Sequence, residues 1–386
     1  MSENLASVAS PVAIEHLRWS LVPEVGPVHF ARIVERFGSA QAALDAGPSQ
    51  LAGIDGIGPA TAAQIASDRG RVDLRQELEL AEGHGVRILC GEDAEYPAAL
   101  RHVPDPPICL YVRGRLEPED AVAIGVVGAR RCTHYGREQA YRFGYQLASS
   151  GVTVVSGLAR GVDSESHKGA LAAGGRTIAV LGNGLASVYP PEHAELADRI
   201  ARQGAVVSEL PMTTAPSGNN FLPRNRLIAG LSLGVLVVEA ARRSGSLTTA
   251  RLASEYNREV FAVPGRVDNE LAHGVNRLIR DQHAKLVMTV DDIMSELGEV
   301  GQALGLSTAE PANGSASAAA AGLRDEERAV LEVLGAEAVS LEAIADATGQ
   351  PAARIAATLI GLQLRGLARQ LPGNIFVRAN RKQAAG

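Results

Sequence analysis

The sequence contains little cysteine and no long apolar run. Its three cysteines, Cys90, Cys109 and Cys132, lie far apart, without the paired spacing of a disulfide framework or a zinc site. We therefore expect no metal and a reducing, cytoplasmic setting. No run reaches the roughly 18 apolar residues that a membrane span requires. Residues 1–20 carry acidic side chains and no apolar signal core, so a secretory leader is not expected either.

The chain also lacks the positive charge of a simple polyanion-binding protein, since its net charge is −6 over 386 residues. The excess of acidic residues lies in the N-terminal third of the chain. Residues 1–120 hold 10 Lys and Arg against 18 Asp and Glu, whereas residues 121–297 hold 19 against 16. The middle of the chain is thus mildly basic. Of the 37 basic residues 34 are arginine, a skew that a GC-rich genome also produces, so it is not by itself evidence of nucleic-acid binding.

From residue 121 onward, apolar strand-like runs alternate with segments of helix length. Continuous apolar strands are buried on both faces, which predicts a parallel sheet covered by helices. The runs are AVAIGVV, VTVVS, TIAVL, AVVSEL, GVLVVEA, EVFAV and KLVMT, with two further candidates near residues 89 and 111. Ligands of such sheets bind beyond the carboxyl ends of the strands. Glycine-rich or polar turns follow several of these runs, so the candidate site lies there.

Residues 11–83 read as short helices separated by Gly and Pro. The stretch LAGIDGIGPATAAQI has the spacing of a helix-hairpin-helix, with Gly56 and Gly58 in the hairpin. Such a hairpin offers backbone amides to a DNA phosphate. A protein contact is the alternative, because no Lys or Arg falls between residues 48 and 66 and Asp55 lies in the turn.

The residue pattern of the C-terminal part of the chain predicts a separate module. Residues 298–322 are small and low in complexity, as in a flexible linker. Three helices and a strand pair around Pro-Gly-Asn follow, which is typical of a winged helix. Its third helix offers Arg354 and Arg365, so duplex reading and a protein contact both stay open. We expect these parts: a helical hairpin (SAM-like) domain at 1–83, a Rossmann-like domain at 84–297, the linker at 298–322 and a winged-helix-like domain at 323–386.

Familiar nucleotide fingerprints are missing. There is no GxxxxGK[ST], and GNGLAS (182–187) resembles only half of a dinucleotide motif, without its third glycine. Glu209 lies near the expected distance of a ribose-binding acid, but one acid is weak support. We expect no cofactor.

The segment GNNFLPRNRLIAG (218–230) places two arginines and a phenylalanine before an apolar, helix-like run. Arginines at a helix start favour an anion, and Phe221 offers a stacking surface unless it is core. Arg224 and Arg226 are two positions apart and do not share a helix face, so one of them could pair with an internal acid. Asp163 and His167 favour a structural role over acid–base chemistry.

Six motifs, in this order, resemble the DprA/Smf family of DNA-processing proteins: VVGAR, VVSGLARGVDSESHKGAL, LGNGLASVYP, FLPRNRLIAGLS, VVEAARRSGSLTTA and FAVPGRVDNELAHGVNRLI. The resemblance implies an extended Rossmann-like α/β fold between a helical hairpin domain and a winged-helix module. It also implies a non-enzymatic homodimer that binds single-stranded DNA, protects incoming strands in natural transformation and loads the RecA recombinase.

Carried over by motif, the resemblance implies a set of strand-binding residues in the middle of the chain: Gly128, Arg130, Ser156, Gly157, Gly182, Gly184, Phe221, Arg224, Asn225 and Arg226. The chain departs from the family in two places. It reads FLPRNR where many relatives read FPxRNR, and His193 stands where relatives often carry Asn.

Two other functions stay open. Related Rossmann-like phosphoribohydrolases cleave nucleoside monophosphates and carry a PGGxGTxxE signature. The corresponding stretch here, EAARRSGSLTTARLASE, lacks the motif glutamate that follows the threonine after two intervening residues. The other alternative is a protein-interaction scaffold with a vestigial pocket.

Overall fold

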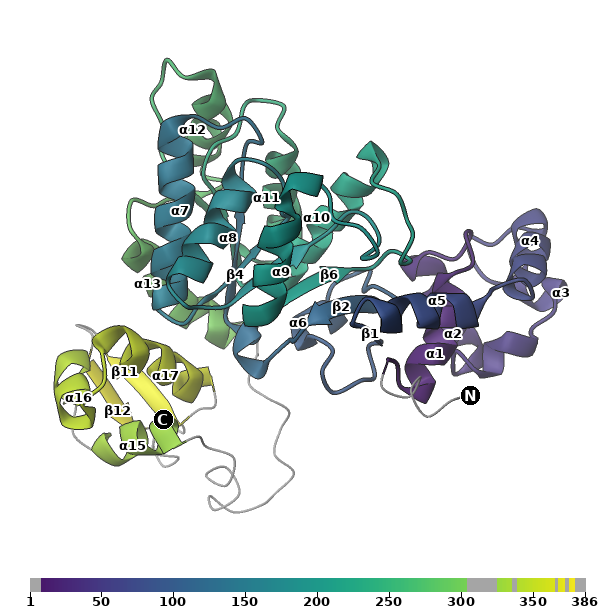
Figure 1. The fold of residues 1–386 in the computed structure, drawn as a ribbon, viewed down its shortest axis with the longest axis horizontal. Coiled ribbons are helices and arrows are strands. Elements are labelled where there is room, and N and C mark those ends of the chain that lie inside the picture. Colours follow the sequence, from purple (N-terminus) through teal and green to yellow (C-terminus); the bar gives the residue numbers. More distant parts are fainter. Residues whose placement is uncertain (1–7, 304–324, 335–338, 365–366, 372–374, 379–386) are drawn as a thin grey trace.

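The computed structural model describes residues 8–303, 325–334, 339–364, 367–371 and 375–378. A helical region at the front leads into a central sheet, and a small helix-and-strand module ends the chain (Figure 1). Most of the linker predicted at 298–322 lies outside the described residues. The predicted domain limits remain predictions.

Nine strands form the central sheet, in the order β1-β2-β6-β5-β4-β3-β7-β8-β9. The strands are β1 (Val86–Leu89), β2 (Leu110–Gly114), β3 (Ala123–Val127), β4 (Thr153–Ser156), β5 (Thr177–Val180), β6 (Ala205–Ser208), β7 (Gly234–Val237), β8 (Glu259–Ala262) and β9 (Lys285–Leu286). Neighbours from β6 to β9 are parallel, as predicted, and every residue of β3 to β7 is buried. The α/β, Rossmann-like prediction is confirmed.

The order of the strands creates a crevice beside β3. The chain runs from β3 outward through β4, β5 and β6, then returns to place β7 on the other side of β3. The loops that follow β3 and its neighbours run in opposite directions at this point. They leave room for a ligand beyond the carboxyl ends of the strands. The two leading strands extend the β6 edge in antiparallel pairings, which the apolar runs did not predict.

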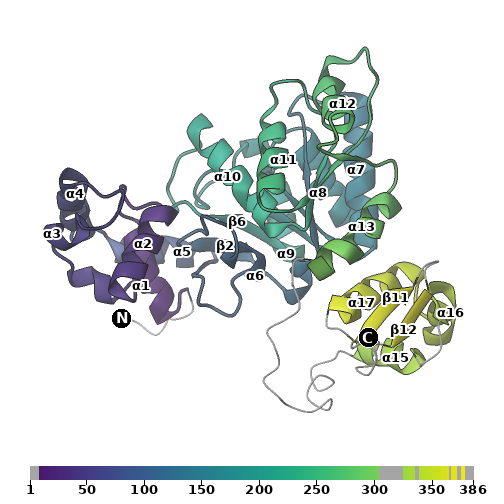
Figure 2. The same cartoon turned by 180° about the vertical axis from the view of Figure 1, so that it is seen from behind.

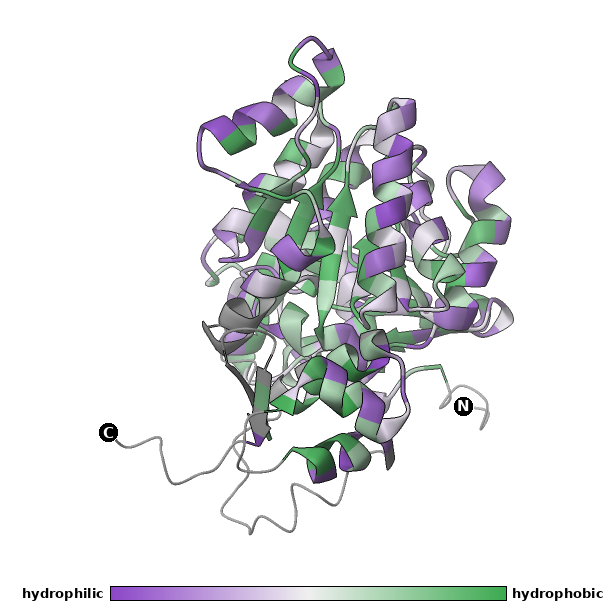
Figure 3. Ribbon diagram, turned by 90° about the vertical axis from the view of Figure 1, so that its left-hand side faces the viewer, coloured by the Kyte–Doolittle hydropathy of each residue, from purple (hydrophilic) through white to green (hydrophobic). Residues whose placement is uncertain are grey.

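Helices cover both faces of the sheet (Figures 1 and 2). One face carries α7 (His134–Ser149), α8 (Val162–Ala172), α9 (Ala194–Gln203) and α13 (Val290–Ala303). The other carries α6 (Ala98–Arg101), α10 (Gly218–Leu231), α11 (Gly245–Glu255) and α12 (His273–Arg280). In Figure 3 the apolar strands lie between these helices, whose outward sides are mostly polar. The chain thus buries its apolar runs by packing helices against them.

The front helices share a hydrophobic core with the edge of the sheet. They are α1 (Pro11–Ser20), α2 (Pro27–Phe37), α3 (Pro48–Leu51), α4 (Pro59–Arg69) and α5 (Leu74–Gly83). Leu17 and Trp19 belong to the same buried cluster as Tyr111 of β2. The Glu77 carboxylate of α5 accepts hydrogen bonds from the Tyr111 hydroxyl (2.8 Å) and the Met212 amide (2.7 Å). This region is therefore joined to the loop that precedes α10.

The predicted helix-hairpin-helix is formed by α3 and α4. Gly56 has φ +82° in the turn, where a side chain would be strained, and Ala62 of α4 is buried. Arg32 of α2 donates a hydrogen bond to the Asp55 carbonyl (2.7 Å) and pairs with its carboxylate (3.2 Å). The guanidinium of Arg32, from the same chain, therefore lies beside the turn and neutralises Asp55.

The C-terminal module has the predicted three helices and strand pair. Its elements are α15 (Asp325–Val333), β10 (Val339–Ser340), α16 (Leu341–Thr348), α17 (Ala352–Leu364), β11 (Ala368–Leu371) and β12 (Ile375–Arg378). Its sheet has the order β10-β12-β11. Arg354 pairs with Glu326 of α15, while Arg365 and the predicted Pro-Gly-Asn turn lie outside the described residues.

The three cysteines are buried and free, and burial raises the pKa of Cys90 to about 12. At neutral pH that thiol is protonated and a poor nucleophile. Within the described ranges, no helix combines the length and the apolar character that crossing a membrane requires.

Candidate functional site

A cleft of about 240 Å³ opens at the carboxyl edge of the sheet, in the crevice beside β3. It is bounded by the loops after β3, β4 and β7 and by the first half of α10. Five predicted site residues line it: Gly128, Arg130, Phe221, Arg224 and Asn225. The topology brings these residues together from segments almost 100 positions apart.

The prediction that the two arginines stand at the start of the helix is wrong. Helix α10 begins at Gly218, capped by the Ser217 hydroxyl, so Arg224 and Arg226 lie inside it. Glycine, asparagine and proline favour loops and turns, but the cap and the packing of the helix against the sheet extend it over them. Any anion bound by Arg224 is therefore not also held by the first amides of α10.

Arg224 is a buried cation in the wall of the cleft, with 5% of its surface exposed. Its Nη1 donates to the Val180 carbonyl (2.8 Å), and the guanidinium lies over Gly157, where a Cβ would stand 1.6 Å from Nη1. Burial lowers its pKa to about 10, so it stays charged at neutral pH. Among the described residues, its buried Nε has no hydrogen-bond partner.

Asp163 stabilises the loop between β4 and α8. Its buried carboxylate accepts hydrogen bonds from the amides of Gly157 (3.1 Å) and Ala159 (3.3 Å). Burial raises its pKa, although the positive charge of Arg224 opposes that shift. The carboxylate thus orders the loop and balances part of the charge of Arg224, in keeping with a structural role.

His167 lies away from the cleft, buried against β5, with Nδ1 2.7 Å from the Thr177 hydroxyl. Burial lowers its pKa to about 3, whereas the unfolded value is about 6.5. Protonation therefore favours the unfolded chain, and stability from this group is lost as pH falls below about 6.5.

We expect His167→Gln to remove this acid sensitivity. Relative to pH 7.5, the unfolding free energy of the wild type should lose about 1.4 kcal/mol more than that of the variant at pH 5.5. Chemical denaturation at the two pH values measures the difference. Equal losses in both proteins would contradict the buried, neutral imidazole.

Phe221 is half-buried at the mouth of the cleft. The guanidinium carbon of Arg130 lies 4.8 Å from its ring centroid, and the Tyr189 ring lies 5.7 Å away at an angle of 34°. Gly182 makes room for this arrangement, since a Cβ there would stand 2.9 Å from Cδ1 of Phe221. Sequence reasoning missed Tyr189, for which the only signal was an aromatic residue in LGNGLASVYP.

Five predicted site residues do not line the cleft. Gly157 and Gly182 lie against Arg224 and Phe221 of its wall, and the other three have internal partners. The Ser156 hydroxyl donates to the Val126 carbonyl (2.6 Å) and joins β4 to β3. Gly184 is packed so closely that a Cβ would stand 2.1 Å from the Pro211 carbonyl oxygen. The Arg226 guanidinium is paired with two acids, Asp105 (3.1 Å) and Glu209. These residues support the surrounding loops and helix rather than facing the cleft.

The far side of the cleft is the start of α11. The Ser244 hydroxyl caps the helix, and Asn225 reaches across from α10 to donate to the Gly245 carbonyl (3.4 Å). The first amides of a helix carry partial positive charge and lack intrahelical partners. This end of the cleft therefore offers further donors to an anion.

Glu239, which sequence reasoning also missed, orients the loop after β3. Its buried carboxylate accepts hydrogen bonds from the Thr133 amide (2.8 Å) and hydroxyl (2.6 Å). Thr133 in turn caps α7. Glu239 thereby ties the end of β7 to the loop that carries Arg130.

The cleft as a whole presents guanidinium and amide donors and an aromatic ring. Its acid, Asp163, is engaged by backbone amides. Within the described residues, no three His, Cys, Asp or Glu side chains gather to hold a metal ion. The arrangement is suited to binding an anionic, ring-bearing ligand.

Comparison with known proteins identifies the family. A family model described as DNA recombination-mediator protein A matches residues 87–298, more than half of the chain. The chain belongs to the DprA/Smf family. Two further models match on either side, a DprA-like N-terminal HHH domain at residues 13–69 and a DprA winged helix domain at residues 314–374. The recognition made from the six motifs is confirmed.

Relatives in the DprA/Smf family cover most of the chain. Protein Smf of Escherichia coli is 42% identical over 312 residues, 81% of this chain and 82% of that protein. DNA processing protein DprA of Bacillus subtilis is 40% identical over 216 residues, 56% and 72% of the two chains.

Two solved DprA structures have the same fold. DprA from Streptococcus pneumoniae matches with a TM-score of 0.64 and 32% identity, over 73% of this chain and 95% of that one. DprA from Helicobacter pylori, whose single-stranded DNA binding mode has been described, matches with a TM-score of 0.50 and 29% identity, over 55% and 96%.

Proposed function

We propose that this DprA/Smf chain binds single-stranded DNA in the cleft beside β3, without sequence preference and without catalysis. In that role it protects incoming strands during natural transformation and loads RecA on them, in the cytoplasm and as a homodimer. The proposal rests above all on Arg224, a buried and charged guanidinium in the wall of the cleft that retains an unpaired donor. Membership of the family supports the remaining parts of the proposal.

The cleft residues divide into two kinds of contact. Arg224, Arg130 and the first amides of α11 take backbone phosphates, since cations and free N–H groups suit the anion. Phe221, with Tyr189 beside it, takes the face of a base, because stacking tolerates any base. Gly157 and Gly182 make room for Arg224 and Phe221, Gly128 lines the cleft, and Asn225 holds the two helices together.

A homodimer strengthens binding by a modestly basic cleft on an acidic protein. Two clefts of a homodimer on one strand raise affinity by roughly 10²–10⁴ without any new contact. This explains how a modestly basic surface suffices.

The enzyme alternative has less support. The stretch that corresponds to the hydrolase signature, residues 239–255, covers the loop after β7 and the whole of α11. Its two glutamates are engaged elsewhere: Glu255 pairs with Arg251 at the end of the helix, and Glu239 accepts hydrogen bonds from Thr133. Incubation with AMP or GMP should release no free base, and any turnover would contradict the binding function.

Binding to single-stranded and duplex DNA of equal length tests the proposal. We expect preference for the single strand, since stacking needs unpaired bases. Phe221→Ala should weaken that binding by about 1–3 kcal/mol and leave its salt dependence unchanged, because no charge is lost. Tyr145→Ala is the matched control, since it removes an exposed aromatic side chain of α7. Equal binding by wild type and Phe221→Ala would exclude stacking on this ring, and no binding by the wild type would favour the scaffold alternative.

A further inference from the structure

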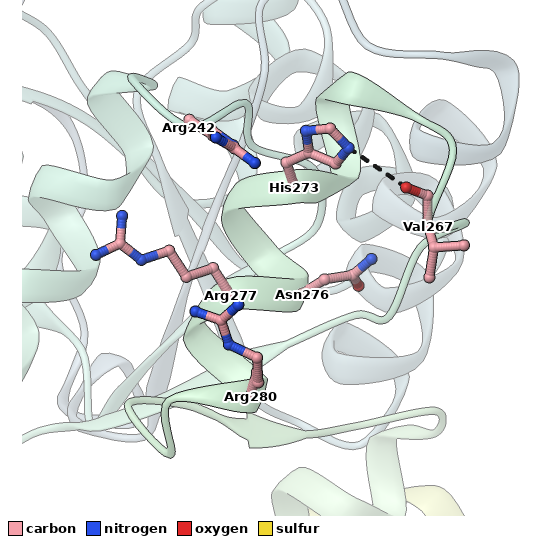
Figure 4. A pocket seen from close by; sticks show the side chains of 6 residues that line it. All are labelled: Arg242, Val267, His273, Asn276, Arg277 and Arg280. Carbon is pink, nitrogen blue, oxygen red and sulfur yellow. Dashed lines mark hydrogen bonds between the residues drawn. The ribbon is translucent and has the colours of Figure 1, made fainter.

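A second, larger cleft of about 400 Å³ lies beside α12 and carries a concentration of arginine. Its lining includes Arg242 from the loop after β7 and Arg277 and Arg280 from α12 (Figure 4). The three guanidinium groups lie on one side of α12 in this view, while Asn276 turns toward the loop of Val267. None of these residues belongs to the DNA-binding set proposed for the first cleft.

The two clefts are neighbours on one loop. Arg242 lines the second cleft, Ser244 and Gly245 line the first, and only Arg243, which is exposed, stands between them. The two clefts therefore share the loop after β7.

The spacing between the clefts is held rigidly. The Gly274 amide of α12 donates to the Ala240 carbonyl (2.7 Å), and a Cβ on Gly274 would stand 2.5 Å from that oxygen. The helix is thus seated on the loop with no room for a side chain. The distance between two subsites joined by such a contact changes little. Less conformational entropy of the protein is therefore lost when one ligand binds across both.

The second cleft has an excess of positive charge. Arg277 and Arg280 share one carboxylate, that of Asp281, at 3.2 Å and 2.8 Å. In the described part of the chain, no acidic side chain forms an ion pair with Arg242. Three guanidinium groups therefore face one carboxylate. Exposed groups of this kind suit the repeated charges of a polymer better than a single small anion, which would need buried donors.

We propose that the second cleft is a phosphate-binding subsite for the continuation of the single strand held in the first cleft. Arg242 and Arg277 contact the backbone phosphates that emerge past the loop after β7. The exposed Val267, with 86% of its surface accessible, lies beside a sugar or base. This subsite rests on the proposed function, and it makes the binding site longer than the first cleft alone.

Oligonucleotide length separates the two clefts. The double variant Arg242→Ala/Arg277→Ala and the wild type are titrated with oligothymidylates of about 5 and about 15 nucleotides, within the range that single-strand-binding modules cover. We expect affinity for the longer strand to fall roughly five- to tenfold, as for two exposed charge contacts. The slope of log K against log salt should flatten by about 1.4 for that strand. The shorter strand should bind as before.

A matched control is Arg199→Ala/Arg251→Ala. Arg251 pairs with Glu255 four residues on, as Arg277 does with Asp281, and Arg199 is exposed on α9, like Arg242 in its loop. The control changes the net charge equally outside both clefts. Equal losses in the two double variants, or equal effects on both strand lengths, would overturn the second subsite and leave the first intact. Failure of the wild type to bind either strand would overturn the proposed function and this subsite together.

Discussion

Arg224→Ala is expected to weaken binding of single-stranded DNA by about 10–100-fold. The variant removes a charged donor whose hydrogen bonds to a phosphate contribute about 1.5–3 kcal/mol. Because one phosphate contact is lost, the slope of log K against log salt should flatten by about 0.7. Titrations at several salt concentrations measure both effects. Arg130→Ala should flatten the slope equally, with a smaller loss of affinity, because Arg130 is exposed.

Folding controls are needed, because Arg224 also donates to the Val180 carbonyl and balances Asp163. Arg224→Lys keeps the charge but loses the planar fork, so its affinity should lie between those of the wild type and the alanine variant. Melting temperatures of the three proteins are compared with their affinities. A loss of binding that only follows a loss of folding would contradict a direct contact. Unaltered binding by a folded Arg224→Ala would exclude the first cleft as the site.

Arg226→Ala is expected to act on stability instead. Its guanidinium is paired with Asp105 and Glu209 and has 8% of its side chain exposed. Burial raises the pKa of Glu209, and the positive charge of Arg226 opposes that shift. Removing the cation leaves two carboxylates together in a poorly solvated place, which costs about 3–5 kcal/mol. Chemical denaturation followed by circular dichroism measures this loss.

Binding by the folded fraction distinguishes this role from a DNA contact. Below the unfolding transition, Arg226→Ala should keep wild-type affinity and salt slope. Arg226→Met combined with Glu209→Gln should recover part of the stability, because it restores packing and removes one stranded charge. A flattened salt slope in a stable Arg226→Ala protein would instead return Arg226 to the DNA-binding set.

Much of the fold could be predicted from local patterns. Apolar runs such as AVAIGVV and VTVVS are followed by helix-length segments, and a buried parallel sheet is the structure that hides such runs on both faces. The position of the site followed from the same reasoning, since ligands lie at the carboxyl ends of these strands. Residues of the loops, such as Gly128 and Arg130, could be named because their motifs are dense and lie directly after strands.

Tertiary packing decided the rest. Arg224 and Arg226 are close in sequence and similar in chemistry, yet one lies over Gly157 in the cleft and the other between Asp105 and Glu209. Their i, i+2 spacing indicated different faces of a helix, but which face meets the cleft depends on partners far away in the chain. Tyr189 reaches Phe221 only because the loop after β5 lies beside α10.

The sequence by itself thus determined the element types, the parallel sheet and the glycine-rich edge, because these depend on local periodicity and turn chemistry. Only the tertiary structure decided that the front helices share a core with β2, and that Glu77 joins them to the loop before α10. It also decided which arginines face open clefts and which are neutralised by acids. Those outcomes depend on contacts between residues distant in the sequence, which no local pattern contains.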